Sequence, residues 1–176
     1  AYAGKNPMPT VDEMVLMMIY ANGQGVPRNL PLARQFTCKY SWAPAERDLR
    51  MQHLDAIEKG EPGSAPIHMC EDITSGAMMG ICASVDSGKA EVARDAKLDA
   101  LAGRFPPAAK AAYAKLRKAA TEYLNAAAEN EEDPGGSGHV AWVAEAYDND
   151  ADAFLADVQA FAAGKYPEAT GDADAD

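Results

Sequence analysis

A regular stripe between positions 107 and 130 restricts the fold of this chain more than any other feature of the sequence. The stripe consists of Ala109, Tyr113, Leu116, Ala120, Tyr123 and Ala127. Its steps alternate between four and three residues, which places all six side chains on one face of an α-helix. Such spacing is typical of the buried face of a helix in an antiparallel bundle. Pro106-Pro107 marks the point where one helix ends and the next begins.

Two further segments complete the predicted bundle. A long helical stretch covers about 73–103, before the two prolines, and a last helix covers about 138–163. We expect the last helix to bury Val143, Tyr147, Phe154, Val158 and Phe161. Residues 69–163 are therefore predicted to form an antiparallel three-helix bundle. The acidic tail that follows, residues 164–176, is expected to be disordered.

Residues 1–60 predict a smaller helical segment in front of the bundle. Helices are expected over about 11–21, 31–40 and 44–59, separated by turns that contain glycine or proline. Residues 60–68 hold two prolines and two glycines, so we place the domain boundary there. The complete prediction is an all-α protein in which a short helical hairpin, about 10–59, packs on the three-helix bundle.

Charge and composition exclude several classes of function. The chain has 176 residues, with 16 Lys and Arg against 27 Asp and Glu, and its net charge is −11. This acidity argues against binding to nucleic acid or to an anionic membrane surface, both of which select basic patches. No apolar run approaches the roughly 20 residues that a membrane-spanning helix needs. Alanine supplies about a fifth of the chain, which favours helix.

Motifs of catalysis or metal binding are incomplete in this sequence. The segment 148–152 begins like a calcium-binding loop, but Ala153 stands where the turn needs glycine and Gln159 where a bidentate glutamate is needed. Residues 68–72 contain His, Cys, Glu and Asp without a second ligand pair at zinc spacing. On its predicted helix, His53 fits a packed histidine better than a ligand. We therefore expect no catalytic centre, no metal and no cofactor, and predict that the protein is not an enzyme.

The first part of the chain resembles one unit of a known repeat. Tyr20-Ala-Asn-Gly-Gln-Gly-Val-Pro-Arg-Asn-Leu-Pro-Leu-Ala33 is similar to the Sel-type tetratricopeptide-like repeat. Such units pair two antiparallel helices around a Gly-x-Gly-Val turn. A single unit cannot bury its own apolar face, so it is expected to pack on the residues that follow.

Five motifs in the remainder support a second resemblance. They are Cys70-Glu-Asp-Ile-Thr-Ser-Gly-Ala-Met-Met-Gly-Ile-Cys82, Leu98-Asp-Ala-Leu101, Phe105-Pro-Pro, Leu116-Arg-Lys-Ala-Ala-Thr-Glu-Tyr123 and Asn130-Glu-Glu-Asp-Pro-Gly-Gly-Ser137. Together they resemble the LprI-type lysozyme-inhibitor-like family over roughly residues 69–163. Many members of that family carry a further cysteine five residues after the tyrosine, where this chain has Ala128.

The resemblance implies an envelope protein, periplasmic, secreted or held in the envelope by a lipid anchor, whose named activity is the inhibition of lysozyme. A start at Ala1, without an initiator methionine, fits a mature chain after removal of a signal peptide. We expect one disulfide that includes Cys70, and Cys82 and Cys38 compete as its partner. Because Ala128 replaces a family cysteine, the sequence leaves this choice open.

Two classes of function follow from these observations. The first is a lysozyme inhibitor or immunity protein that binds a basic, peptidoglycan-degrading enzyme, which the net charge of −11 would attract. The second is a periplasmic adaptor or scaffold that binds partner proteins through its repeat-like hairpin. For the first, we expect the partner to contact the loop between the last two helices. The candidate residues there are Glu131, Glu132, Asp133, Gly135 and Gly136.

Overall fold

The computed structural model describes residues 11–39, 43–131 and 135–165. Six α-helices contain 77% of these residues, and the described part of the chain contains no strand. The predicted all-α class is therefore confirmed. None of the helices in these ranges is both long and apolar enough to cross a membrane.

The chain divides into two compact units, residues 1–79 and residues 80–176. This division lies later than the boundary expected at residues 60–68. The reason is that the segment after the third helix carries apolar side chains that are buried in the first unit. These side chains are Ile67, Met69 and Met78.

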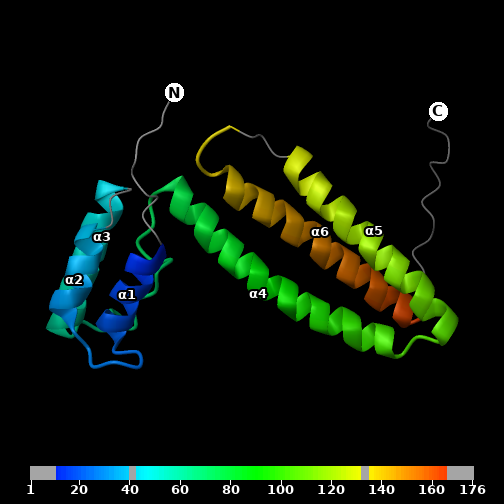
Figure 1. The fold of residues 1–176 in the computed structure, drawn as a ribbon, viewed down its shortest axis with the longest axis horizontal. Coiled ribbons are helices and arrows are strands. Elements are labelled where there is room, and N and C mark those ends of the chain that lie inside the picture. The colour runs from blue at the N-terminus through cyan, green and yellow to red at the C-terminus, as the bar shows by residue number, and fades with distance from the viewer. Residues whose placement is uncertain (1–10, 40–42, 132–134, 166–176) are drawn as a thin grey trace. The chain divides into compact units, whose positions relative to one another are not determined.

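The first unit contains α1 (Val11–Asn22), α2 (Leu30–Lys39) and α3 (Pro44–Lys59), which Figure 1 shows beside one another. These three helices agree with the helices expected over about 11–21, 31–40 and 44–59. Its core consists of Met17, Ala21, Ala33, Leu54, Ile57 and Ile67. Gly60 ends α3 in the left-handed conformation, with a φ of 71°, and its N–H bonds back to the helix.

The second unit contains α4 (Gly76–Gly103) from Gly80 onward, α5 (Pro107–Glu131) and α6 (His139–Ala162) (Figure 1). Proline begins α5, as the sequence predicts. The central core cluster takes one side chain from α4, one from α5 and two from α6. Its members are Leu98, Tyr113, Leu155 and Val158.

Ion pairs between helices accompany this core. Arg94 on α4 is buried and bonds to both Asp148 and Asp152 on α6. Arg117 on α5 pairs with Asp95 and Asp99 on α4. Asp148 and Asp152 belong to the segment that resembles the start of a calcium-binding loop. In the structure this segment is part of the continuous helix α6, and both carboxylates bind the guanidinium group of Arg94.

Three residues predicted to be buried in the bundle are exposed. Leu116 and Tyr123 on α5 are 54% and 66% exposed, and Phe161 on α6 is 51% exposed. Tyr113 and Ala127 of the predicted stripe are buried, whereas Leu116 and Tyr123 lie on one flank of the stripe and face solvent. The buried side of α5 continues on the opposite flank, through Leu124 and Ala128.

Candidate functional site

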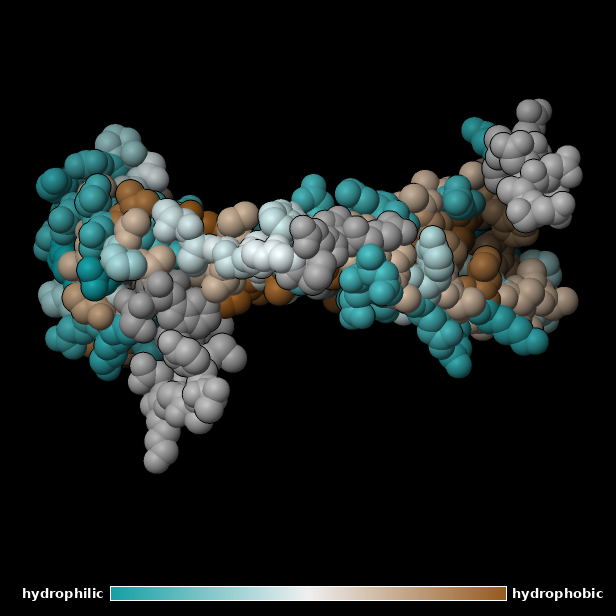
Figure 2. All heavy atoms as spheres, turned by 90° about the horizontal axis from the view of Figure 1, so that it is seen from above, coloured by the Kyte–Doolittle hydropathy of each residue, from teal (hydrophilic) through white to brown (hydrophobic). Residues whose placement is uncertain are grey.

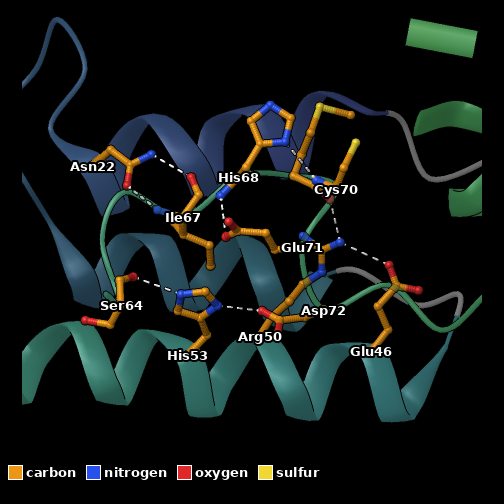
Figure 3. A network of polar contacts seen from close by, with 11 residues as sticks. Asn22, Glu46, Arg50, His53, Ser64, Ile67, His68, Cys70, Glu71 and Asp72 are labelled. Atoms are coloured by element: carbon orange, nitrogen blue, oxygen red, sulfur yellow. Dashed lines mark hydrogen bonds and ion pairs between the residues drawn. The ribbon is translucent and has the colours of Figure 1, made fainter. Parts of the chain in front are cut away.

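A network of polar contacts lies along α3 in the first unit (Figure 3). Glu46, Arg50 and His53 are spaced by four and three residues, so they share one side of the helix. They face a segment, residues 61–75, that returns past the helix after Gly60. We call these residues and their partners the α3 polar cluster.

A buried ion pair forms one end of the α3 polar cluster. The Nη2 of Arg50 donates hydrogen bonds to Glu46 Oε1 at 3.0 Å and to the Met69 carbonyl oxygen at 2.8 Å. The hydroxyl of Ser75 donates to the other carboxylate oxygen of Glu46, Oε2, at 2.8 Å. The Glu46 and Arg50 side chains are at most 1% exposed. Charges buried this deeply are tolerated only when they are paired, so the returning segment is pinned at Met69 and Ser75.

His53 forms the other end of the cluster. Its Nδ1 lies 2.7 Å from Asp72 Oδ2, and its Nε2 lies 2.8 Å from the Ser64 carbonyl oxygen. A carboxylate and a carbonyl oxygen can only accept, so both ring nitrogens donate and the imidazole carries both protons. Burial lowers the pKa of His53, but the bonds to Asp72 and Ser64 outweigh it and leave the pKa above 6.5.

The side chain of Asn22 holds the backbone of the same segment against α1. The Asn22 side-chain amide donates to the Ile67 carbonyl oxygen at 2.7 Å and accepts from the Ile67 N–H at 2.9 Å. Further along, the His68 N–H donates to Glu71 Oε2 at 2.9 Å. Residues 64–75 are thus fixed by side chains of two different helices, which sets the position of Cys70 (Figure 3).

The disulfide joins Cys70 to Cys82, so Cys82 is the correct one of the two expected partners. Cys38 has a free thiol and is exposed. The bridge closes a short loop that contains the start of α4. Ser75 begins that helix, because its hydroxyl oxygen accepts the Met78 N–H at 3.3 Å.

The chemistry of the α3 polar cluster favours a structural role. A histidine oriented by an aspartate is the base of many hydrolases, but such a base needs a free lone pair on its second nitrogen. In His53 that nitrogen donates to the Ser64 carbonyl. Within the described ranges, no three His, Cys, Asp or Glu side chains are grouped so that they could hold a metal ion. Of the residues 68–72, Cys70 is in the disulfide and Asp72 binds His53.

The expected partner-binding loop is only partly described. Glu131 is the last residue of α5, whereas Glu132 and Asp133 lie outside the described residues. Gly135 and Gly136 are exposed, and Gly136 has a φ of 93°, which favours glycine. Gly135 and Gly136 therefore lie a few residues before α6, which begins at His139.

Trp142 lies beside this connection and was not singled out from the sequence. A Cβ atom at Gly138 would lie only 3.2 Å from Trp142 Cζ2, so glycine makes room for the indole ring. Trp142 as a whole is 40% exposed. The only signal in the sequence is a glycine four positions before a tryptophan, at the start of a predicted helix. This pattern is common in helical proteins and does not by itself indicate a binding site.

The charge of α6 is the second feature of this region. The helix carries Glu145, Asp148, Asp150, Asp152 and Asp157 and contains no lysine or arginine. Arg94 on α4 forms ion pairs with two of these carboxylates, those of Asp148 and Asp152. The other three make no ion pair with any residue that the structure describes. The surface of α6 is therefore acidic and carries the partly exposed side chain of Trp142 near the first turn of the helix.

Comparisons of the chain with protein-family models, with curated proteins and with solved structures found no match.

Proposed function

We propose that this chain is a non-enzymatic protein of the bacterial envelope that binds and inhibits a lysozyme-like, peptidoglycan-degrading enzyme. The observation that carries the proposal is the acidic helix α6 with the exposed Trp142 at its start. Enzymes of this class are generally basic because their substrate is an anionic polymer. An acidic surface attracts such a partner and speeds its association.

The disulfide supports the proposed compartment. Cys70–Cys82 is held between a pinned segment and the first turns of α4, which is the setting of a stable, structural bridge. Structural disulfides persist in the periplasm and outside the cell, whereas cytosolic thiols are kept reduced. A periplasmic or secreted location would both preserve this disulfide and give the protein access to a cell-wall hydrolase.

Trp142 supplies the proposed anchor of the interface. Tryptophan is enriched among the few residues that carry most of the binding energy of an interface, because it buries a large area and loses little conformational freedom. Around it, Glu145 on α6 and the acidic residues 131–133 would pair with basic residues at the rim of the partner's cleft. Gly135 and Gly136 would allow the backbone of the connection to approach that rim closely.

A binding and lysis experiment tests this function. The oxidised full-length chain is titrated into purified lysozymes by calorimetry, and lysis of cell-wall suspensions is followed by turbidity. We expect binding with inhibition of lysis, and an affinity that falls as salt screens the charges. Absence of binding across lysozymes of different classes would refute the proposal.

Three variants locate the surface once a partner is found. Trp142→Ala should weaken binding by about tenfold or more, as for an interface anchor. Tyr123→Ala is the matched control, because Tyr123 is also an exposed aromatic side chain of the second unit but lies on α5. Replacing Glu131, Glu132 and Asp133 together with alanine should flatten the salt dependence of the affinity. Equal losses for Trp142→Ala and Tyr123→Ala would exclude the start of α6 as the interface.

A further inference from the structure

A cavity of about 550 Å³ opens between α5 and α6 in the second unit, and Trp142 does not line it. Its volume lies within the range of about 300–1,000 Å³ that is usual for sites that bind small molecules. The short side chains of Ala109 and Ala112 on α5 leave this space between the helices. Figure 2 shows apolar surface exposed at the end of the second unit that holds the start of α5.

Aromatic rings form the walls of this cavity. Phe105 contacts Tyr113 and Phe161 edge to face, with ring centroids 5.4 and 6.1 Å apart. Phe154 on α6 completes the aromatic lining. Edge-to-face contacts hold the rings in fixed orientations, so the walls are preformed rather than collapsed.

Two of the three side chains that were predicted to be buried but are exposed lie at the rim of this cavity. Leu116 and Phe161 both line the cavity, and more than half of each side chain is in contact with solvent. Leaving two large apolar side chains in water at the mouth of an open cavity costs free energy that an apolar ligand would recover.

One charged side chain lines the cavity. Asp157 on α6 is exposed, lies one position before the buried Val158, and is among the three carboxylates of α6 that make no ion pair with a described residue. A carboxylate at the mouth of an apolar site selects a positive charge, and the faces of aromatic rings attract cations as well. A ligand complementary to this arrangement has an apolar body and one cationic end.

We propose that the cavity between α5 and α6 binds an organic amine, with its apolar body among the phenylalanine rings and its ammonium group on Asp157. This site would be separate from the proposed surface around Trp142, and it does not depend on lysozyme binding.

Three probes with the same alkyl chain test the selection of charge. Octylammonium, octanol and octanoate are each titrated into the oxidised full-length chain, and binding is followed by calorimetry and by NMR shifts of residues that line the cavity. We expect octylammonium to bind most tightly and octanoate least. Equal binding of the three probes would show that the site has no preference for a cation and would overturn the proposal.

Variants test the position of the site. Asp157→Asn should weaken octylammonium binding about two- to fivefold, as for a solvent-accessible ion pair, and leave octanol binding unchanged. Glu145→Gln is the matched control, since it removes one charge from the same helix without touching the cavity, and should change neither. Ala109→Leu fills the cavity with a good helix former and should reduce the binding of all three probes at least tenfold.

Two results would overturn this assignment. The first is unchanged octylammonium affinity in a folded Ala109→Leu variant, because the probe would then bind elsewhere. The second is a concentration-dependent dimer that Ala109→Leu dissociates, with no binding of the amine to the wild-type chain. That result would assign the cavity to a second copy of this protein.

Discussion

His53 links the stability of the first unit to pH, because each of its ring nitrogens donates to an acceptor. The imidazolium form is the one that satisfies both Asp72 and the Ser64 carbonyl, and Glu71 adds a further negative charge nearby. The folded-state pKa is raised above 6.5, the ordinary value that applies in the unfolded chain. Protonated His53 therefore stabilises the fold below about pH 6.5, and this contribution is lost as pH rises through the higher folded pKa.

We expect the free energy of unfolding of the wild-type chain to fall, as pH rises above about 6.5, by more than that of a His53→Gln variant. Denaturant unfolding at a series of pH values measures the difference between the two. His139→Gln serves as the control, because His139 lies on α6 in the other unit, and it should keep the wild-type pH dependence of the first unit. Parallel curves for wild type and His53→Gln would contradict the protonated assignment.

The sequence indicated that the hydrogen-bonding groups of His53 are satisfied, but it did not indicate which residues satisfy them. Its partners Asp72 and Ser64 are 19 and 11 residues away in the chain. The ion pair between Glu46 and Arg50 could be predicted, because the two residues are four positions apart on one helix. Their hydrogen bonds to Ser75 and to the Met69 carbonyl could not be predicted from spacing. Local spacing predicts contacts within a helix, whereas contacts with a returning loop depend on how that loop turns.

The helices are the part of the fold that the sequence predicts best. Glycine and proline stand at nearly every helix end, and their backbone preferences act locally, so the expected bounds agree with the structure to within a few residues. The side of α5 that is buried was predicted less well, since Leu116 and Tyr123 are exposed. Tyr113 and Ala127 were placed correctly, but residues three and four positions after Tyr113 lie on opposite flanks of the stripe, and packing against the other helices decides which flank is buried.

The close contact between α4 and α6 at Gly80 gives a second prediction. A Cβ atom built on Gly80 of α4 would lie 2.9 Å from Val140 Cβ on α6, which is too close for two carbon atoms. Gly80→Ala should therefore lower the free energy of unfolding by about 1 kcal/mol or more, although alanine favours the helix. Thermal and denaturant unfolding measure the change.

Gly88 supplies the matched control in the same helix. A Cβ atom there has nothing within 4 Å, so Gly88→Ala should stabilise the protein by roughly 0.5–1 kcal/mol through helix propensity alone. If both substitutions stabilised the protein equally, α4 and α6 would not approach each other at Gly80.

The domain boundary expected at residues 60–68 and the division of the structure after residue 79 fall at different places in the chain. Residues 60–68 have the composition of a linker, but Ile67 is buried in the first core and its backbone bonds to Asn22. Composition describes whether a segment can turn, whereas burial depends on one or two apolar residues within it. The candidate cluster on α3 depends on that same burial, so it could not be predicted without the fold.

The disulfide gives the last prediction, because it closes a loop between Cys70 and Cys82 whose geometry the α3 polar cluster already fixes. Cross-linking a loop of this length reduces the entropy of the unfolded chain, by an amount worth about 3 kcal/mol. Cys82→Ser should lower the free energy of unfolding by about that amount under oxidising conditions. With reductant present, the wild-type chain and the variant should unfold at similar denaturant concentrations.

Cys38→Ser is the control for this experiment, because the Cys38 thiol is free and exposed. It should leave stability nearly unchanged and remove the one thiol that reacts with an alkylating reagent in the unfolded, non-reduced wild-type chain. Two reactive thiols in Cys82→Ser and one in the wild type would follow from the Cys70–Cys82 pairing. A wild-type chain with three reactive thiols would contradict the pairing, and it would also remove the support that the bridge gives to a location in the envelope.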